Sequence, residues 1–170
     1  MKLTDLLLAE LERESGPTRR TLERVPEGRY DWKPHEKSMT LGNLATLVAT
    51  MPGWIDMMVN QDQLDIAPVG GSAYKPAALR TVRDLVEALD GAVAKGREAL
   101  ASTTEEHLMT PWKLLAGGHV MSEQLRYIAI REGVFSHLAH HRGQLTVYLR
   151  LNGASVPAIY GPSADEGRSQ

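Results

Sequence analysis

Four segments of the chain carry apolar residues at the spacing of an amphipathic helix. They span about residues 2–25, 39–60, 81–101 and 122–151. In the third segment Leu85, Leu89 and Val93 recur between charged positions, a period that is typical of a helix with one buried face. No segment sustains the apolar and polar alternation of a strand. The pattern predicts an all-α fold, an up-down four-helix bundle.

The ends and breaks of these helices are marked by proline, glycine and capping residues. Gly16 and Pro17 are expected to kink the first helix, because proline lacks the N–H group and clashes with the preceding turn. Pro52 is expected to bend or divide the second helix. The third opens on a sequence that resembles a capping box, Thr81 to Asp84. Asn152 and Gly153 are typical of a helix C-terminus.

The connections between the segments are rich in turn-forming residues. Residues 61–80 form a long connection between the second and third helices, and residues 110–121 have the composition of a linker in which a short strand-like piece is the only alternative. The extended tail, residues 153–170, has too much proline and glycine for a helix, and Ile159 and Tyr160 are candidates to anchor it. Together the segments predict a single domain over residues 1–170.

The amino-acid composition excludes several kinds of active site and argues against some classes of binding partner. The 170 residues include no cysteine, so a disulfide framework, a cysteine nucleophile and cysteine-ligated metal are excluded. The net charge of −2 and a pI near 6.3 argue against nucleic-acid binding. The N-terminus lacks the features of a signal peptide, and Leu41 to Val59 is too polar for a confident membrane span. We therefore expect a cytoplasmic protein that handles a small molecule.

The strongest chemical signal is a histidine pair on the fourth segment. His137 and His141 are four residues apart, so they project from one helix face and can ligate one ion, and His140 lies at the edge of that face. They fall in the row of Val134 and Tyr148, which the pattern turns inward. Such pairs are more often ordinary hydrogen-bonded histidines. Because catalytic zinc usually has three protein ligands, a third must come from another helix.

Several stretches together resemble one family. The run from His137 to Leu151, HLAHHRGQLTVYLRL, and the run PAIYGPS at 157–163 are similar to the C-terminal signature of the DinB/YfiT-like metalloenzymes. The second-helix region of that family is matched by DWKP at 31–34, KSMTLGNLA at 37–45 and PGW at 52–54. The resemblance covers the chain. It implies a four-helix bundle, often a homodimer, with a metal site between the second and fourth helices.

The resemblance also assigns the ligands. It places two of them at His137 and His141, and a third histidine of the second helix at the position that Leu47 occupies here. Leucine cannot coordinate a metal, so the site is expected to be incomplete and the occupancy of a divalent ion such as zinc, nickel or iron to be low. Relatives of this kind include transferases and isomerases that use a low-molecular-weight thiol.

Other residues are candidates to line the site. Asn43 and Met51 lie one helical turn to either side of Leu47, although a core role is favoured for Met51. The remaining candidates are His140, Arg142 and Tyr148. His119, in a Gly-Gly-His turn, is the linker histidine most worth examining as a substitute ligand.

Two hypotheses follow. In the first, His137 and His141 hold a divalent metal that activates water or a thiol co-substrate for transfer or hydrolysis. In the second, loss of the third histidine leaves a non-catalytic dimeric bundle that binds a small molecule or a partner without metal. A homodimer is expected in both cases, with Trp54, Met57 and Met58 as candidates for its surface. No catalytic residue is assigned.

Overall fold

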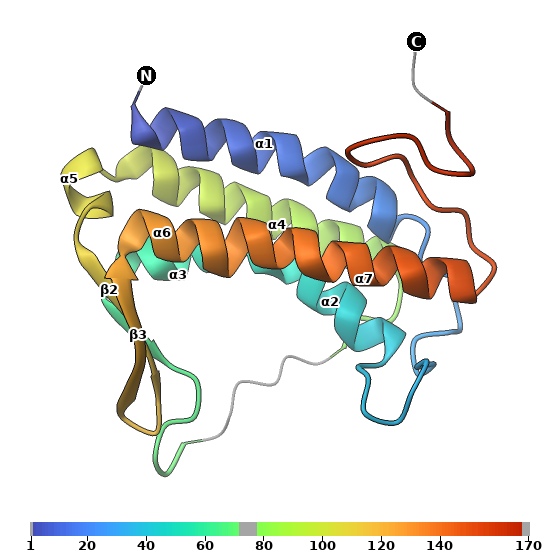
Figure 1. The fold of residues 1–170 in the computed structure, drawn as a ribbon, viewed down its shortest axis with the longest axis horizontal. Coiled ribbons are helices and arrows are strands. Elements are labelled where there is room, and N and C mark those ends of the chain that lie inside the picture. The colour runs from blue at the N-terminus through green and yellow to red at the C-terminus, as the bar shows by residue number, and fades with distance from the viewer. Residues whose placement is uncertain (1, 72–77, 168–170) are drawn as a thin grey trace.

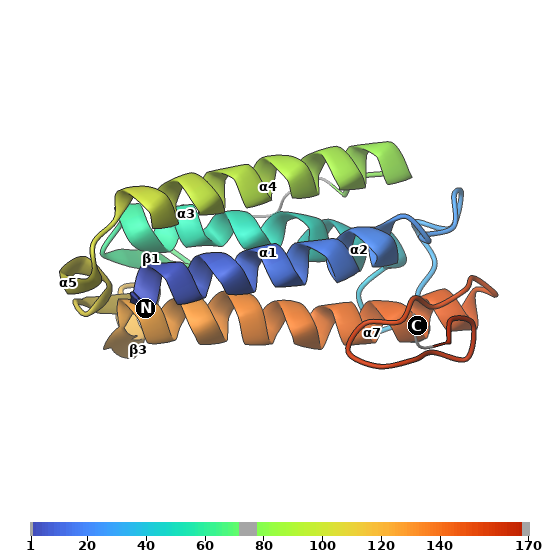
Figure 2. The same ribbon diagram turned by 90° about the horizontal axis from the view of Figure 1, so that it is seen from above.

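The computed structural model describes residues 2–71 and 78–167, and it combines helices with a small sheet. Its long helical stretches lie side by side around one apolar core (Figures 1 and 2). They are α1 (Leu3–Leu22), α2 (Leu41–Thr50), α3 (Trp54–Asn60), α4 (Val82–Ser102), α6 (Arg126–Ile130) and α7 (His137–Leu151). A short helix, α5 (Glu105–Leu108), follows α4.

The expectation of an all-α bundle is wrong. A three-stranded mixed sheet joins β1 (Gln63–Asp65), β2 (Pro111–Ala116) and β3 (His119–Leu125) in that order. β1 pairs parallel to β2, and β2 pairs antiparallel to β3 with an irregularity between Leu114 and Leu115. The fourth predicted helix therefore starts at Arg126 instead of Ser122, because residues 122–125 belong to β3.

A carboxylate holds the turn of the β2–β3 hairpin. Asp65 accepts hydrogen bonds from the backbone N–H groups of Ala67 at 3.0 Å, Gly117 at 3.0 Å and Gly118 at 2.7 Å. Both glycines have positive φ, as a tight hairpin turn requires. These backbone hydrogen bonds, that from Ala67 first, hold the pKa of Asp65 below its usual value. Asp65 thus joins the hairpin turn to β1, which lies in the long connection predicted for residues 61–80.

The prolines within the helices have different effects. α1 continues through Pro17, so the kink expected at Gly16 and Pro17 does not end the helix. Pro52 divides the second stretch, as predicted, because a 3-10 turn at Met51–Gly53 separates α2 from α3. The predicted caps are confirmed at Thr81, whose side chain accepts from the N–H of Asp84, and at Gly153, whose φ is 74°.

The last helical stretch is continuous but not uniform. Between α6 and α7 the residues Arg131–Ser136 form a π-helical segment, which places an extra residue in the turn. π-Helical segments are rare in proteins, and those that do occur are often found at functional sites. Here the segment ends directly before His137, the first residue of α7.

Residues 154–167 follow α7 and have no regular secondary structure. They lie beside the C-terminal end of α7 (Figure 2). Tyr160 anchors this tail, as the sequence indicated, by hydrogen bonds to Glu14 and Arg142. Among the described residues, no helix is both long enough and apolar enough to cross a membrane.

Candidate functional site

The histidine pair predicted from the sequence is present as a pair in space. The Nε2 atoms of His137 and His141 lie 2.9 Å apart, and their ring centroids are 4.6 Å apart. Both side chains are half-buried, so they line the rim of the helical core instead of its centre. The spacing of four residues on α7 therefore places two imidazole nitrogens within hydrogen-bond distance of each other.

A chain of hydrogen bonds continues from the pair along α7. Nδ1 of His141 lies 2.8 Å from Oε1 of Gln144, and Nε2 of Gln144 lies 3.0 Å from Nε2 of His140. The amide oxygen can only accept, so Nδ1 of His141 donates the hydrogen bond. In the neutral ring Nε2 of His141 then carries a lone pair, and Nε2 of His137 donates to it. Gln144 thereby fixes the tautomer of His141.

The protonation of the pair is set by its surroundings. Burial lowers the pKa of His141 below its usual value, the hydrogen bond to Gln144 opposes that shift, and the neighbouring His137 and His140 add to it. A lowered pKa favours a neutral imidazole near pH 7, which is the form that accepts hydrogen bonds and binds metals.

Trp54 lies beside the pair, and Leu47 lies on the neighbouring helix α2. The ring of Trp54, at the start of α3, lies 5.9 Å from the ring of His137 at an angle of 54°. Leu47 is half-buried on α2, which packs against α7, and it contacts the apolar core. His137 therefore lies beside an aromatic ring, and the position on α2 at which the resemblance implies a ligand is apolar.

The site offers two side chains that could bind a metal ion, His137 and His141. Among residues 2–71 and 78–167, no group of three or more histidine or acidic side chains is arranged to hold a metal ion. Catalytic zinc usually has three protein ligands. The residues present therefore fit an ion that is held by two imidazoles and by exogenous ligands, and they do not complete the three-histidine site that the resemblance implies.

The other predicted site residues separate into three groups. His140 joins the hydrogen-bonded chain. Asn43 is exposed on α2, Met51 is fully buried in the core, and Tyr148 donates from its hydroxyl to the carbonyl of Met39 at 3.2 Å. No hydrogen bond or ring contact joins any of these three to His137 or His141. His119 is exposed at the start of β3, in the hairpin, and so does not replace the missing ligand.

Arg142 was expected at the site, and the structure places it elsewhere. Its guanidinium is buried against α1, where it donates to Thr18 at 2.9 Å and to the carboxylate of Glu14 at 2.6 Å. Successive helix residues are about 100° apart, so Arg142 leaves α7 on a different side from His141. Sequence reasoning missed the polar partners, although Glu14 and Thr18 interrupt the apolar stripe of Leu7, Leu11 and Leu22.

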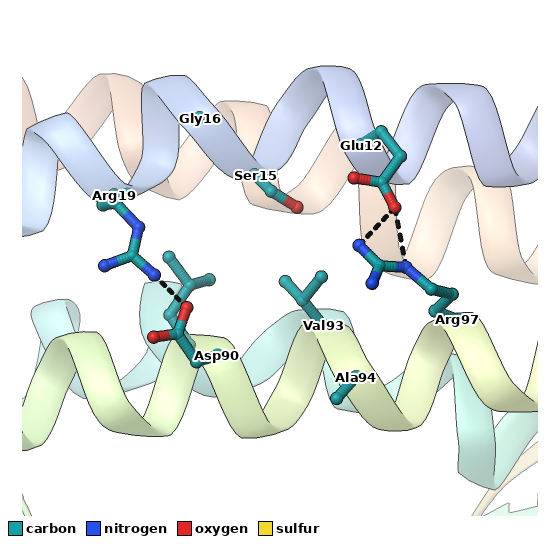
Figure 3. A pocket seen from close by; sticks show the side chains of 9 residues that line it. Glu12, Ser15, Gly16, Arg19, Asp90, Val93, Ala94 and Arg97 are labelled. Atoms are coloured by element: carbon teal, nitrogen blue, oxygen red, sulfur yellow. Dashed lines mark hydrogen bonds and ion pairs between the residues drawn. The ribbon is translucent and has the colours of Figure 1, made fainter.

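Two hollows among the described residues are lined by side chains other than the histidine pair. One, of about 250 Å³, lies between α1 and α4 and is bordered by the ion pairs of Arg19 with Asp90 and of Arg97 with Glu12 (Figure 3). The other, also about 250 Å³, includes His107, whose Nε2 lies 2.8 Å from the carbonyl of Val59. The two ion pairs of the first hollow are partly exposed, and pairs of this kind contribute little to stability.

Comparison with known proteins gives one family and a fold. Residues 1–169 match the profile of the DinB family. The chain is 35% identical over 66 residues to the uncharacterized protein YrdA of Bacillus subtilis, a match that spans 35% of this chain and 37% of YrdA. The fold is similar to crystal structures of two DinB-like proteins, compared below.

The first is YjoA of Bacillus subtilis, with a TM-score of 0.66 and 18% identity over 96% of this chain and 99% of YjoA. The second is a protein of Bacillus cereus ATCC 10987, with a TM-score of 0.68 and 21% identity over 88% of this chain and 92% of that protein. At these identities the two structures support the fold alone.

Proposed function

This chain belongs to the DinB family, and from that premise we propose that His137 and His141 bind one divalent metal ion as a two-ligand centre of a metal-dependent transferase or hydrolase. The observation that carries the proposal is the convergence of the two Nε2 atoms at 2.9 Å. The hydrogen bond from His141 to Gln144 supports it, because metal-binding histidines usually donate their other N–H to such an acceptor.

The residues of the chain have separate roles in this proposal. His137 and His141 hold the ion, Gln144 orients His141, and Trp54 covers one side of the first imidazole. A bound divalent ion such as zinc, nickel or iron would act as a Lewis acid toward water or a thiol. The chain has no cysteine, so a thiol must come from a low-molecular-weight co-substrate.

The missing third donor predicts weak and exchangeable binding. Leu47 offers no coordinating atom, so positions that another protein ligand would occupy are left to water or to a small molecule. We therefore expect an ion that chelators remove easily, in contrast to a resident structural metal.

A second candidate function is a non-catalytic protein that binds a small molecule or a second copy of itself without metal. Leu47 and the lack of any three-donor group among the described residues favour it. For a homodimer, Trp54 and Met57 are half-buried and remain candidates for the interface, whereas Met58 is buried in the core and is not.

Metal analysis of untagged protein separates the two candidates. Purified protein is equilibrated with zinc or nickel, dialysed, and measured by inductively coupled plasma mass spectrometry and by competition with a chromophoric chelator. The variants are His141→Ala, which removes a ligand, and Leu47→His, which adds the third. His119→Ala is the matched control, because it removes an exposed histidine outside the pair.

The proposal expects one weakly held ion in the wild type and in His119→Ala, none in His141→Ala, and tighter binding in Leu47→His. Uptake by Leu47→His alone would show a degenerate centre and favour the metal-free candidate. If neither the wild type nor Leu47→His takes up metal, the placement of the centre is wrong.

A further inference from the structure

A buried arginine interrupts the apolar row of α7. At positions that repeat every three to four residues, this row is almost completely inaccessible to solvent, with exposed fractions of 1% or less. Its members are Leu138, Arg142, Leu145 and Leu149. A position in the middle of such a row normally holds an apolar side chain, so Arg142 requires a specific set of partners there.

Each partner of Arg142 comes from another part of the chain. Nη1 donates to the backbone carbonyl of Glu14 at 3.1 Å and to Oγ1 of Thr18 at 2.9 Å. Nη2 donates to Oε2 of Glu14 at 2.6 Å and to the hydroxyl of Tyr160 at 2.5 Å. The Tyr160 hydroxyl in turn donates to Oε2 of Glu14 at 2.8 Å. The buried carboxylate and guanidinium are thus bridged by the tail.

The tail is fastened on both sides of this bridge. We call residues 154–167 the C-terminal strap; Figure 2 shows it looping beside α1 and α7. Its attachments reach both helices, so the strap joins α1 to α7. They are the hydrogen bond from Arg20 to the carbonyl of Ala158 at 3.0 Å and the ion pairs of Arg24 with Glu166 and of Arg150 with Asp165.

The bridge lies directly beside the histidine pair in the sequence. Adjacent residues of a helix are about 100° apart around its axis, so a rotation of α7 that moves Arg142 must also move His141. An apolar row tolerates small changes of packing, whereas a buried polar group must keep its partners in reach or lose their hydrogen bonds. In some proteins a buried polar group is retained because it selects one packing arrangement over others.

We infer that Arg142, Glu14 and Tyr160 are positioning residues for the histidine pair, and that the C-terminal strap thereby sets the rotation of α7. They lock α7 against α1, and this setting turns the His137 end of the pair toward Trp54 of α3. The inference deepens the proposed function, since it rests on the pair as the functional centre.

Two variants test the lock without removing the fold. Tyr160→Phe removes the bridging hydroxyl and leaves the Arg142–Glu14 pair. The double variant Glu14→Leu with Arg142→Met replaces the buried pair by apolar side chains, a change that is often neutral or stabilising. Tyr127→Phe is the matched control, because it removes a phenol from a half-buried tyrosine on α6 that also packs against the core.

The first measurement is the nuclear Overhauser effect between the indole protons of Trp54 on α3 and the imidazole protons of His137 on α7 in metal-free protein, because these rings lie close together across two helices. We expect a clear signal in the wild type and in Tyr127→Phe, a weaker one in Tyr160→Phe, and a loss of several-fold in the double variant. Zinc affinity should fall roughly 10 to 100-fold in the double variant, the range seen when groups that orient metal ligands are removed.

The outcomes separate this inference from the proposed function. Should both lock variants fold with wild-type thermal stability and keep the ring-to-ring signal unchanged, the inference is overturned. A ring-to-ring signal that depends on the lock in a protein that binds no zinc would refute the proposed function and support the inference. If the double variant does not fold, Tyr160→Phe alone decides.

Discussion

The two sides of α7 satisfy their polar side chains in opposite ways. On the side toward α1, Arg142 is buried, and its hydrogen bonds reach α1 and the C-terminal strap. On the other side, the hydrogen bonds of His137 and His141 remain within α7. The first side therefore joins distant parts of the fold, and the second leaves its donors free to exchange partners.

The difference follows from burial. A buried charge that loses its partner carries a large desolvation cost, so Arg142 and Glu14 must remain together. The histidines are only half-buried, and water or a ligand can replace their mutual hydrogen bond at modest cost. One side of the helix is thus suited to structure and the other to binding.

The largest effect is expected from breaking the buried pair. Glu14→Ala should destabilise the protein by about 3–5 kcal/mol, because it leaves the Arg142 guanidinium buried without its carboxylate. Urea denaturation followed by circular dichroism measures this change. Glu12→Ala, in which an exposed carboxylate of the same helix is removed, should cost roughly 1 kcal/mol or less. Equal effects of the two variants would remove the contrast between the two sides of α7.

On the histidine side, Gln144→Leu should weaken metal binding without a comparable loss of stability. Removing the acceptor for Nδ1 of His141 releases the tautomer and orientation of that ring, which typically costs roughly 10 to 100-fold in metal affinity. Competition with a chromophoric chelator provides the measurement, with Gln124→Leu on β3 as control. An unchanged affinity would show that Gln144 does not orient the site.

Acid should affect the histidine side. Because burial lowers the folded-state pKa of His141, the unfolded chain binds the proton more readily. The associated stability is complete above the ordinary histidine pKa of about 6.5 and is lost as the pH falls through the folded-state value. Unfolding measured from pH 7.5 to pH 5 should therefore show a decline that is smaller in His141→Gln. Parallel profiles for the two proteins would contradict this assignment.

The smallest effect is expected on the outer face of α7. Gly143 is exposed, and a Cβ built there would meet no atom within 4 Å. Gly143→Ala should stabilise the protein by up to about 1 kcal/mol through helix propensity. Gly96→Ala on α4 is the contrasting variant, because its Cβ would lie 2.9 Å from the carbonyl oxygen of Pro52. Thermal unfolding compares the two, and a destabilised Gly143→Ala would indicate a contact from outside this chain.

The local features of the site could be predicted because they depend on nearby residues. The spacing of His137 and His141 places two imidazoles on one face of a helix whatever the rest of the fold does. The same holds for Thr81 as a helix cap and for the division of the second stretch at Pro52. The periodicity also indicated the helical stretches, although it extended the last one into β3.

The sheet could not be predicted in the same way. β1 is only three residues long, and its pairing with β2 joins segments about fifty residues apart, as in the pair of Leu64 with Leu114. β3 is largely exposed, so no buried face imposes an alternating pattern on its sequence. The available signal is the glycine pair at 117 and 118, but such a pair is typical of linkers as well as of hairpin turns.

By itself the sequence determined the helical stretches, the absence of cysteine chemistry, the membership of a recognisable family and the pair at His137 and His141, since each depends on residue type and short spacing. The tertiary structure alone decided that Arg142 turns away from the pair to Glu14 and Tyr160, and that the strand-like piece allowed for residues 110–121 pairs with β1 and β3 in a sheet. Both outcomes depend on partners that are distant in the chain. Long-range contacts of that kind leave no periodic trace in a single sequence.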